Sequence, residues 1–381
     1  MLKIANNVRF HGRRTWPSQF SARWLTACLS QCRHYSTHPI PNQSDDVTNV
    51  KVKIGNTGHV SLIIRHAPRP ETANPIILYL KRGLPSAYGS SVAENVFNLA
   101  TSANSTVVYV DYEDPKALPY PIPIHTVVRA YDWVQQNLAG SRSKTNDRTT
   151  TSRIGVCGEL VGGSLAAMLA LTECHTPGIS AAALGNPIVD WTALHPLVAS
   201  KEPEATPCVK RTNQDGDIQE KVVMSMESLL TLRGNYFSKP EKYHDPFASP
   251  LLFFRTPSSE LPLEYAPSQS SDSEPNPEVV VSDFFKKRRS LRKYPPTYSD
   301  LIIPNIRVNV GKQSVLRDQG FELVDLMRRS FGRWEVDRFT LPGKDIPQRR
   351  FEALDWEGWG LWNDKEIVEI GNWFGDVLQK P

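Results

Sequence analysis

Arg153-Ile-Gly-Val-Cys-Gly-Glu-Leu-Val-Gly-Gly-Ser-Leu-Ala-Ala-Met-Leu-Ala-Leu-Thr172 is the stretch around which the rest of the chain is organised. It opens with a short apolar run that ends at Gly158 and is typical of a buried strand. A Gly-x-x-x-Gly turn follows, from Gly158 to Gly162, and then a segment of alanine and leucine that predicts a buried helix. Glycines suit this turn because the strand and helix backbones approach too closely to leave room for a Cβ. The stretch therefore predicts a strand joined to a buried helix by a sharp turn.

Strand and helix patterns alternate along most of the chain. Two short strand patterns joined through Gly55-Asn-Thr-Gly58 predict an antiparallel hairpin. Beside the quoted stretch, the predicted strands are 50–54, 59–65, 75–80, 105–111, 179–184, 305–310 and 334–341, and the predicted helices are 89–103, 122–138, 220–237, 315–330 and 364–378. The strand patterns are mostly continuous apolar runs, which are typical of strands covered on both faces. The alternation favours a mostly parallel, doubly wound sheet.

Two segments interrupt this pattern. Residues 191–250 are predicted to form a cap over the strand ends, and residues 256–300 an insertion whose first part is rich in Pro, Ser and Glu and is predicted to be disordered. A dense basic cluster lies in the insertion: Lys286, Lys287, Arg288, Arg289, Arg292 and Lys293. The simplest interpretation is a solvated loop that balances the acidic stretch before it. The alternative is a docking site for RNA, an anionic membrane surface or an acidic protein partner.

The N-terminal segment has a composition of its own. Residues 1–44 contain no Asp or Glu but carry Lys3, Arg9, Arg13, Arg14, Arg23 and Arg33. A basic, acid-free, Ser-containing segment is typical of a mitochondrial presequence, although a basic tail without function is the alternative. We therefore predict a targeting presequence at 1–35, one domain at 36–381 and a location in the mitochondrial matrix. Removing residues 1–35 takes away six positive charges and changes the formal net charge from +4 to −2, so the overall charge gives no case for a nucleic-acid partner.

The size and composition of the chain set further limits. A length of 381 residues with 40% hydrophobic residues is enough for one large α/β domain with an inserted cap. The five cysteines are odd in number and include no C-x-x-C pair, so neither a disulfide framework nor a zinc site is indicated. We predict no metal and no cofactor. No run of about 18 apolar residues is present, so we expect no transmembrane helix.

Four segments carry a resemblance to a known family. Gly158-Glu-Leu-Val-Gly-Gly-Ser-Leu-Ala166 is similar to the family motif Gly-Asp-Ser-Ala-Gly-Gly-Asn-Leu-Ala. The segment from Asp111-Tyr112 to Pro121, the segment His244-Asp-Pro-Phe-Ala-Ser-Pro-Leu-Leu252 and the tripeptide Leu316-Arg-Asp318 are similar to three further motifs. On these motifs, residues 75–378 resemble the hormone-sensitive-lipase-like branch of the α/β-hydrolases, particularly its fungal esterases. The resemblance implies an α/β-hydrolase fold, with a mostly parallel, doubly wound, eight-stranded sheet and an inserted helical cap.

The catalytic positions of that family are altered in this chain. Its nucleophile elbow, Gly-x-Ser-x-Gly, is represented by Gly158, Leu160 and Gly162, and a leucine has neither a proton to lose nor a lone pair with which to attack. Its oxyanion-hole motif, His-Gly-Gly-Gly, is represented by Lys81-Arg82-Gly83-Leu84, which adds bulk beside the expected N–H donors. Its acid falls on Ser314, which carries no negative charge to orient an imidazolium. The resemblance therefore implies a degenerate triad.

The general base is the clearest departure. The histidines are at positions 11, 34, 38, 59, 66, 125, 175, 195 and 244, so none follows the seventh strand. The loop expected to supply the base lies near residues 354–359. This region contains Trp356, Trp359 and Trp362, which could line a pocket, although tryptophans more usually pack in a core. Loss of the nucleophile or the base alone costs a serine hydrolase on the order of 10⁶ in turnover. The resemblance therefore implies negligible esterase activity.

Several side chains near the turn are candidates for a substitute role. Ser164 is expected to face the packing side of the helix, and Cys157 lies in the strand, where burial makes a thiol inert. Glu159, His195 and Trp356 are candidate cleft residues, although a lone carboxylate at Glu159 suggests no reaction. His195 follows the sixth strand, where the cap begins, and a surface histidine is the more usual outcome there. Asp318 could replace the missing acid only if the start of the following helix moved by about a turn.

These features favour a catalytically inactive α/β-hydrolase-fold protein of mitochondria. Its cleft is expected to bind a small apolar ligand or a protein partner, because ligands of such sheets bind at the carboxyl ends of the strands. One alternative is an active carboxylic-ester hydrolase with a non-standard nucleophile, such as Ser164 or another serine close to His195 or His125. The other is a scaffold that binds RNA, lipid or protein through the basic loop 286–293.

Overall fold

The computed structural model describes residues 47–55, 58–69, 74–83, 92–112, 119–140, 151–195, 224–258, 291–296, 299–338 and 350–379, with only the backbone at 333–338. The predicted presequence 1–35 therefore lies outside the described residues. So do most of the predicted insertion 256–300 and residues 196–223 of the predicted cap.

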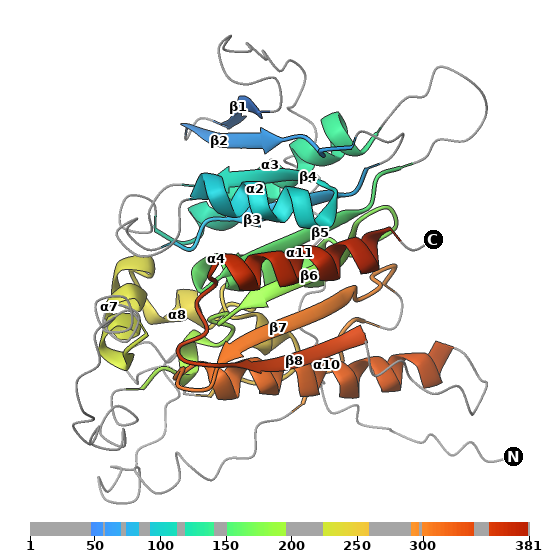
Figure 1. Ribbon diagram of the computed structural model, residues 1–381. Helices are drawn as coiled ribbons and strands as arrows, with labels where there is room; N and C mark the ends of the chain where they lie inside the picture. The colour runs from blue at the N-terminus through green and yellow to red at the C-terminus, as the bar shows by residue number, and fades with distance from the viewer. Residues whose placement is uncertain are drawn as a thin grey trace, which may run out of the picture. The chain divides into compact units, whose positions relative to one another are not determined.

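Eight strands form one sheet in the order β1-β2-β4-β3-β5-β6-β7-β8 (Figure 1). β1 and β2 pair antiparallel, β2 and β4 also pair antiparallel, and the other neighbouring pairs are parallel. The strands are β1 Val47–Ile54, β2 Gly58–Arg65, β3 Ile76–Leu80, β4 Thr106–Asp111, β5 Ile154–Glu159, β6 Ile179–Gly185, β7 Asn305–Gly311 and β8 Phe351–Trp356. The central strands are almost wholly buried, as expected for strands covered on both faces. The predicted hairpin and the predicted doubly wound, mostly parallel sheet are confirmed.

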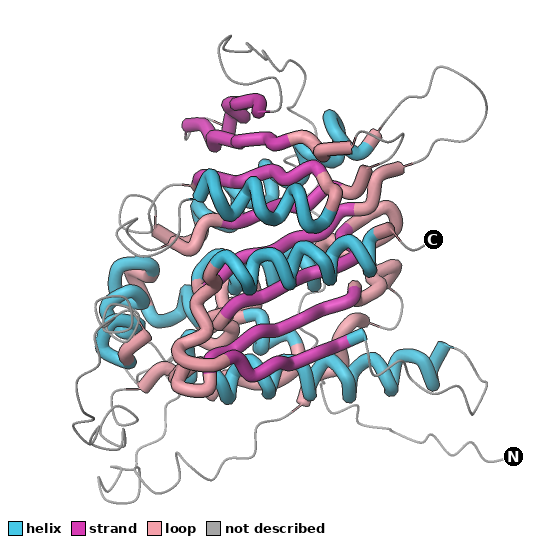
Figure 2. The backbone as a smooth tube through the Cα atoms, in the orientation of Figure 1, coloured by secondary structure: helices cyan, strands magenta, loops and turns pink. Residues whose placement is uncertain are grey.

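Helices cover both faces of the sheet (Figure 2). α2 (Val92–Ala103) and α11 (Asp364–Leu378) pack on one face, and α3 (Ile122–Val134), α4 (Val161–Thr172) and α10 (Arg317–Arg338) pack on the other. A π-helical turn, Gln135–Ala139, extends α3. In β3, Ile77 and Tyr79 join the core beneath α2 and α11, whereas Ile76, Leu78 and Leu80 join the core on the opposite face. This division follows from the two-residue period of a strand.

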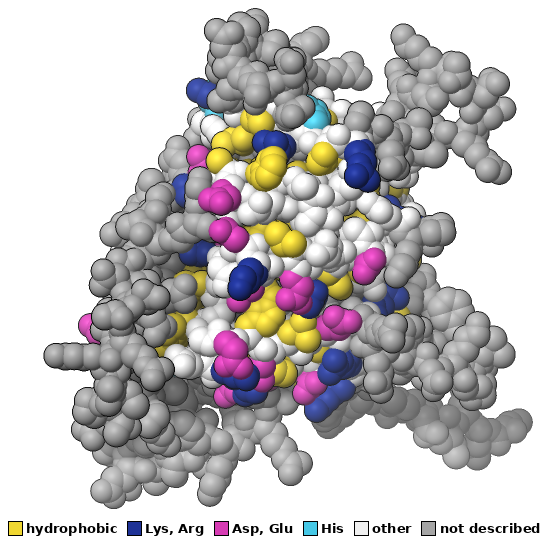
Figure 3. Space-filling view, in the orientation of Figure 1, with side chains coloured by type: hydrophobic (Ala, Val, Ile, Leu, Met, Phe, Trp, Pro, Cys, Tyr) yellow, Lys and Arg dark blue, Asp and Glu magenta, His cyan; other side chains and the backbone are white. Residues whose placement is uncertain are grey.

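The face that carries α2 and α11 mixes hydrophobic and charged side chains (Figure 3). Phe97 of α2 is 46% exposed, and the guanidinium of Arg65 lies 4.5 Å from the centre of its ring. α11 begins at Asp364 because Asn363 and Glu366 form a capping box, in which the Asn363 side chain accepts from the backbone N–H of Lys365 and of Glu366. The predicted helix 364–378 is therefore confirmed at both ends.

The eighth strand lies elsewhere than the sequence predicted. Residues 334–338, the start of the predicted strand 334–341, belong to α10, and the eighth strand is β8. The alternation of polar and apolar residues after Trp334 has the period of a strand, but an established helix gains one hydrogen bond for each residue that extends it. β8 has no continuous apolar pattern because it is an edge strand, in which Glu352 and Asp355 face solvent at least in part. The predicted strand at 334–341 is therefore wrong.

The cap lies between β6 and β7. Its described elements are the turn Trp191–Ala193, the helices α7 (Met226–Tyr236) and α8 (Pro240–Tyr243), and the turn Pro250–Phe253. α7 begins after Ser225, whose hydroxyl accepts from the backbone N–H of Ser228. The rings of Trp191, Tyr236 and Phe237 pack with their centres 4.7 to 5.7 Å apart. None of the described helices is long and apolar enough to cross a membrane.

Candidate functional site

The turn between β5 and α4 has a strained backbone at its apex. Leu160 has φ 51° and ψ −112°, a region that residues with a side chain rarely occupy. Its N–H donates to the carbonyl of Gly185 at 2.9 Å, and its carbonyl accepts from the N–H of Ser164 at 2.9 Å. These bonds fix the apex between β6 and the first turn of α4. The turn therefore has the shape of an elbow, with a leucine where a nucleophile would stand.

Close backbone contacts explain the two glycines of this turn. A Cβ on Gly158 would lie 2.6 Å from the carbonyl group of Gly162, and a Cβ on Gly162 would lie 2.3 Å from the carbonyl oxygen of Lys81. No real Cβ tolerates such distances to backbone atoms. The side chain of Leu160 is wholly buried and joins the main hydrophobic core. At the apex, the structure thus places packed hydrocarbon rather than a solvent-facing reactive group.

The segment Lys81–Gly83, which follows β3, is held by ion pairs at two consecutive residues. The guanidinium of Arg82 binds the carboxylate of Glu159 through Nε at 3.1 Å and Nη2 at 2.8 Å. The ammonium of Lys81 lies 2.9 Å from a carboxylate oxygen of Asp111. Gly83 has φ 77°, and a Cβ there would lie 2.8 Å from the Cβ of Val161. The segment predicted as a degenerate oxyanion region therefore lies directly against the start of α4.

Glu159 joins this segment to a second loop. Its carboxylate also accepts from the backbone N–H of Trp362 at 2.7 Å. Its side chain is 1% exposed, and the Arg82 side chain is 15% exposed. Glu159 is thus a buried partner of a cation and of a backbone donor, not a lone carboxylate. The sequence signal for this pair was weak, because 77 residues separate its members.

Ser314 stabilises the approach to α10. It lies in the turn after β7, where its hydroxyl accepts from the backbone N–H of Leu316 at 3.1 Å. Its side chain is buried, with 6% exposure of the residue. Asp318, the possible replacement acid, lies exposed in the first turn of α10, which begins at Arg317. Asp318 therefore stands four residues after Ser314, on the exposed side of the helix start, and does not take the buried position of Ser314.

The loop after β8 comprises residues 357–363, later than the predicted 354–359, and it too contains no histidine. The side chain of Asn186 holds it: Nδ2 donates to the carbonyls of Trp359 at 2.9 Å and Gly360 at 2.7 Å, and Oδ1 accepts from the N–H of Gly311 at 3.1 Å. Trp362 is buried in the core beneath α2 and α11. The tryptophan whose N–H reaches Glu159 therefore packs in the core rather than lining a cleft.

The three candidate cleft residues lie on different parts of the domain. Glu159 ends β5 and Trp356 ends β8, and because β6 and β7 lie between, their strands are about 14 Å apart at the usual strand spacing. Trp356 is half-buried and packs against the core beneath α2 and α11. His195 is exposed and is the last described residue before residues 196–223. The structure therefore does not gather these three side chains at one point.

The remaining candidates for a substitute nucleophile or base have structural surroundings. The hydroxyl of Ser164 donates to the carbonyl of Ala248 at 3.2 Å, which ties α4 to the end of the cap. Burial raises the pKa of the Cys157 thiol well above its usual value, so the thiolate is not populated near neutral pH. His125 is exposed on α3. These positions favour packing and surface roles over nucleophilic catalysis.

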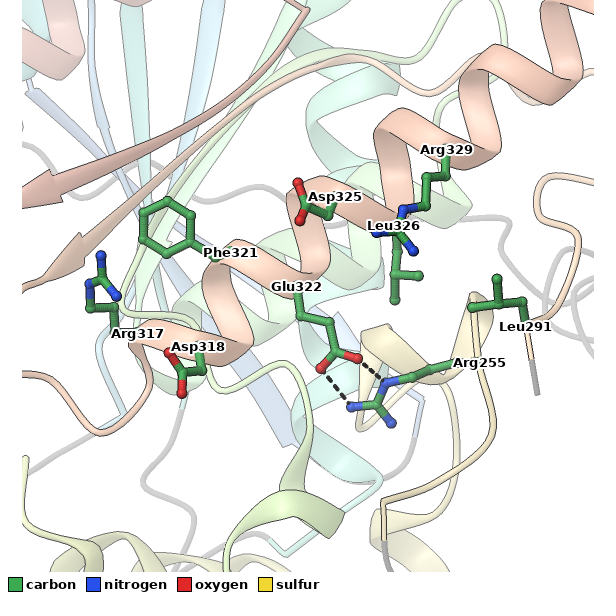
Figure 4. A pocket seen from close by; sticks show the side chains of 9 residues that line it. All are labelled: Arg255, Leu291, Arg317, Asp318, Phe321, Glu322, Asp325, Leu326 and Arg329. Atoms are coloured by element: carbon green, nitrogen blue, oxygen red, sulfur yellow. Dashed lines mark hydrogen bonds and ion pairs between the residues drawn. The ribbon is translucent and has the colours of Figure 1, made fainter. Parts of the chain in front are cut away.

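A buried charge network joins the loop after β6 and the end of the cap to α10. Arg255 donates to Asp190 at 2.7 Å and to Glu322 of α10 at 2.7 and 3.0 Å. Ser258 also donates to Asp190, at 2.7 Å. A pocket of about 480 Å³ opens beside this network (Figure 4), lined by Arg255, Leu291, Arg317, Asp318, Phe321, Glu322, Asp325, Leu326 and Arg329. No sequence pattern indicated this pocket, because its residues come from three separate segments.

The predicted basic docking cluster is described only in part. Lys286, Lys287, Arg288 and Arg289 lie outside the described residues. Arg292 anchors the chain where the insertion ends: its N–H donates to the carbonyl of Phe254 at 2.7 Å, and its guanidinium donates to the carbonyl of Leu252 at 3.1 Å. Lys293 is exposed. At Arg292, the positive charge is thus engaged with a backbone carbonyl of the cap.

Comparison with known proteins agrees with this architecture. A family model described as an alpha/beta hydrolase fold matches residues 87–263. A hyperthermophilic esterase from the archaeon Pyrobaculum calidifontis is 16% identical, with a TM-score of 0.54 over 88% of this chain and 85% of that chain. EstE1, a thermophilic carboxylesterase cloned from a metagenomic library, is 16% identical, with a TM-score of 0.55 over 94% of both chains. Carboxyl esterase 2 from the mycorrhizal fungus Tuber melanosporum is 14% identical, with a TM-score of 0.52 over 94% of this chain and 98% of that chain.

No curated protein sequence matches the chain. The sheet order, the inserted cap and these structural matches together show that the chain has an α/β-hydrolase fold. Identities of this size speak for the fold, and a shared fold does not fix a shared reaction. The residues at the elbow and around it therefore decide the function.

Proposed function

We propose that this protein is a non-hydrolytic α/β-hydrolase-fold protein, related to the hormone-sensitive-lipase-like esterases, that binds a small apolar ligand or a protein partner. The observation that carries the proposal is the apex of the elbow. Leu160 has the strained backbone of a nucleophile position, but its side chain is hydrocarbon and wholly buried. Nucleophilic attack on an ester carbonyl requires an oxygen or sulfur atom there.

The surroundings of the apex support the same conclusion. Ser314, in the position expected for the acid, carries no charge, and its hydroxyl accepts the N–H of Leu316. The loop after β8 carries no histidine that could act as general base. Arg82 is engaged with Glu159, and Gly83 lies against Val161. Since the members of a triad act as a unit, restoring any one of them leaves the reaction without its partners.

The test is a direct search for esterase chemistry in the full-length protein. Hydrolysis of p-nitrophenyl acetate should not exceed the buffer rate, and a fluorophosphonate probe should label no residue. Leu160→Ser should remain unlabelled, because a serine without a general base is a weak nucleophile. Labelling of the unmodified protein, mapped to one serine and abolished by Ser164→Ala or by alanine at the mapped residue, would establish the active hydrolase instead.

Ligand binding is tested separately from catalysis. Small apolar esters and acids should raise the melting temperature, and the rise should grow with ligand concentration, because a ligand that binds only the folded state stabilises it. The same melting-temperature shift should be measured for Trp191→Ala, which removes one ring from the aromatic cluster of the cap. If no apolar compound shifts the melting temperature, the small-molecule half of the proposal is wrong. A protein partner would then be sought by crosslinking in the source cells.

We also propose that residues 1–35 direct the protein to the mitochondrial matrix. The support is compositional: this segment carries six basic residues and no acidic ones. A fluorescent protein fused behind residues 1–35 should enter mitochondria, and the mature chain should begin near Ser36. Replacing Arg9, Arg13 and Arg14 with glutamine should leave the fusion in the cytosol. Cytosolic fluorescence of the unmodified fusion would refute this part of the proposal.

A further inference from the structure

The carboxylate of Glu159 touches both loops that flank the elbow. It binds the guanidinium of Arg82 in the segment after β3, with three N–O distances of 2.8 to 3.1 Å. It also accepts the backbone N–H of Trp362 in the loop after β8, at 2.7 Å. β3 and β8 are four places apart in the sheet. One side chain therefore connects two loops that the sheet itself does not bring together.

The segment held by Arg82 lies across the start of α4. A Cβ on Gly162 would lie 2.3 Å from the carbonyl oxygen of Lys81, and Gly83 lies against Val161, the residue after the apex. The hydroxyl of Tyr112, which follows β4, donates to the same carbonyl of Lys81. These contacts bring backbone of the segment within van der Waals distance of both residues that follow Leu160.

The two ion pairs of this segment differ in strength. The side chains of Lys81 and Asp111 are 26% and 45% exposed, and water weakens such a pair to little net stabilisation. The side chains of Arg82 and Glu159 are 15% and 1% exposed, and two nitrogens of the guanidinium donate charge-assisted hydrogen bonds to the carboxylate. Removing one partner of a buried pair is strongly destabilising, because it leaves the other charge without compensation. The Arg82–Glu159 pair is therefore the contact most able to hold the segment.

We infer that Glu159 is a latch: it holds the segment after β3 and the loop after β8 closed together, and thereby keeps the elbow apex from solvent. The elbow cleft is then a minor, open state of the protein, reached when the Arg82–Glu159 pair breaks. This inference stands apart from the proposed loss of hydrolysis, because a latch of this kind would operate whichever reaction or ligand the open state serves.

A thiol introduced at the apex reports the latch. In the full-length protein, Leu160→Cys should react slowly with iodoacetamide, at a rate measured by mass spectrometry for the peptide that contains position 160. Adding Arg82→Met should raise this rate by about tenfold or more, because one partner of a buried pair has been removed. Adding Lys81→Met instead, which breaks the exposed neighbouring pair, should change the rate by less than about twofold.

Two further measurements keep the outcome interpretable. The buried thiols of Cys157 and Cys174 should stay unreactive in every variant, which shows that the domain is folded. If Arg82→Met impairs folding, the double change Arg82→Met with Glu159→Gln removes the pair without leaving a buried charge. In either variant, hydrogen exchange at the Trp362 amide should also increase, because the same carboxylate holds both loops.

Three results would overturn the inference. The first is an introduced thiol at position 160 that stays as unreactive as Cys157 when the pair is removed. The second is an equal effect of Lys81→Met and Arg82→Met, which would assign the closure to general loop destabilisation. The third is a reactive thiol at position 160 with unchanged exchange at Trp362, which would show that the two loops open independently. Fluorophosphonate labelling, which tests the proposed function, decides none of these three.

Discussion

Asp190 and Arg255 form a buried ion pair: Oδ2 of Asp190 lies 2.7 Å from Nη2 of Arg255, and the two side chains are 0% and 1% exposed. Both groups have further partners. The other carboxylate oxygen of Asp190 accepts from Thr192, and Arg255 also binds Glu322 of α10. The pair thus joins the loop after β6, the end of the cap and α10. Because each of the two buried charges depends on the other, loss of either should be costly.

Arg255→Met should therefore lower the free energy of unfolding by about 3–5 kcal/mol, since it leaves the buried carboxylate of Asp190 without a counter-charge. Denaturant unfolding followed by tryptophan fluorescence measures this change. The double variant Arg255→Met with Asp190→Asn should recover part of the loss. Asp325→Asn, at an exposed helical pair with Arg328, is the control and should cost less than about 0.5 kcal/mol. A loss of similar size in the control would contradict the assignment.

Two glycines of the chain predict opposite effects for the same substitution. Gly162→Ala would place a methyl group 2.3 Å from the carbonyl oxygen of Lys81, and we expect it to destabilise the fold by at least about 3 kcal/mol. Gly234→Ala lies in α7 with nothing within 4 Å of the new Cβ, and it should stabilise the protein by about 0.5–1 kcal/mol. The two melting temperatures, measured side by side, check both signs.

The strained apex offers a test that separates backbone from packing. Leu160→Ala and Leu160→Gly both remove the buried isobutyl group and should both destabilise the core. At φ 51°, however, glycine is relieved of strain that alanine keeps. We expect Leu160→Gly to be more stable than Leu160→Ala by about 1 kcal/mol. Equal stabilities, or alanine the more stable, would show that the apex is not strained.

His244 predicts a loss of stability in acid. Burial lowers its pKa below the usual value of 6.5, with nearby Arg233 acting in the same direction and Asp190 against it. Well above pH 6.5 the imidazole is neutral in both states, so it has no effect on stability there. As the pH falls from 6.5 towards the lower folded pKa, the unfolded state takes up the proton first, and the folded state loses stability.

His244→Gln should flatten this dependence between pH 7 and pH 5, as measured by the free energy of unfolding at half-unit steps. His125→Gln, at an exposed position of α3, should leave the slope unchanged. A slope in His244→Gln as steep as that of the unmodified protein would assign the acid sensitivity to other groups.

Much of the fold could be predicted because its strongest signals are local. The apolar run, the glycines and the alanine-rich helix around Gly158 predict their own geometry, and the capping box at Asn363 fixes the start of α11. β8 could not be predicted in this way. β8 is a strand because it pairs with β7 at the edge of the sheet. The local sequence around Glu352 and Asp355 does not indicate either the pairing or the edge position.

The site was predictable at single positions but not in its contacts. The place of Leu160 at the apex could be predicted from the turn alone, because the elbow motif fixes which residue stands there. The partnership of Arg82 with Glu159 depends on how β3 and β5 pair in the sheet, which places their ends side by side. The role of Arg255 had no local signal, since its partners lie 65 and 67 residues away.

The turn at residues 158–162 keeps its sharp geometry with an aliphatic side chain at its apex. Backbone contacts among β3, β5 and α4 impose this geometry, and these contacts do not involve the side chain of the apex residue. A backbone comparison will consequently group such a chain with esterases whatever its chemistry. For proteins of this architecture, the turn serves first to join the strand to the helix, and it supports hydrolysis only where the apex side chain is a nucleophile with an acid and a base beside it.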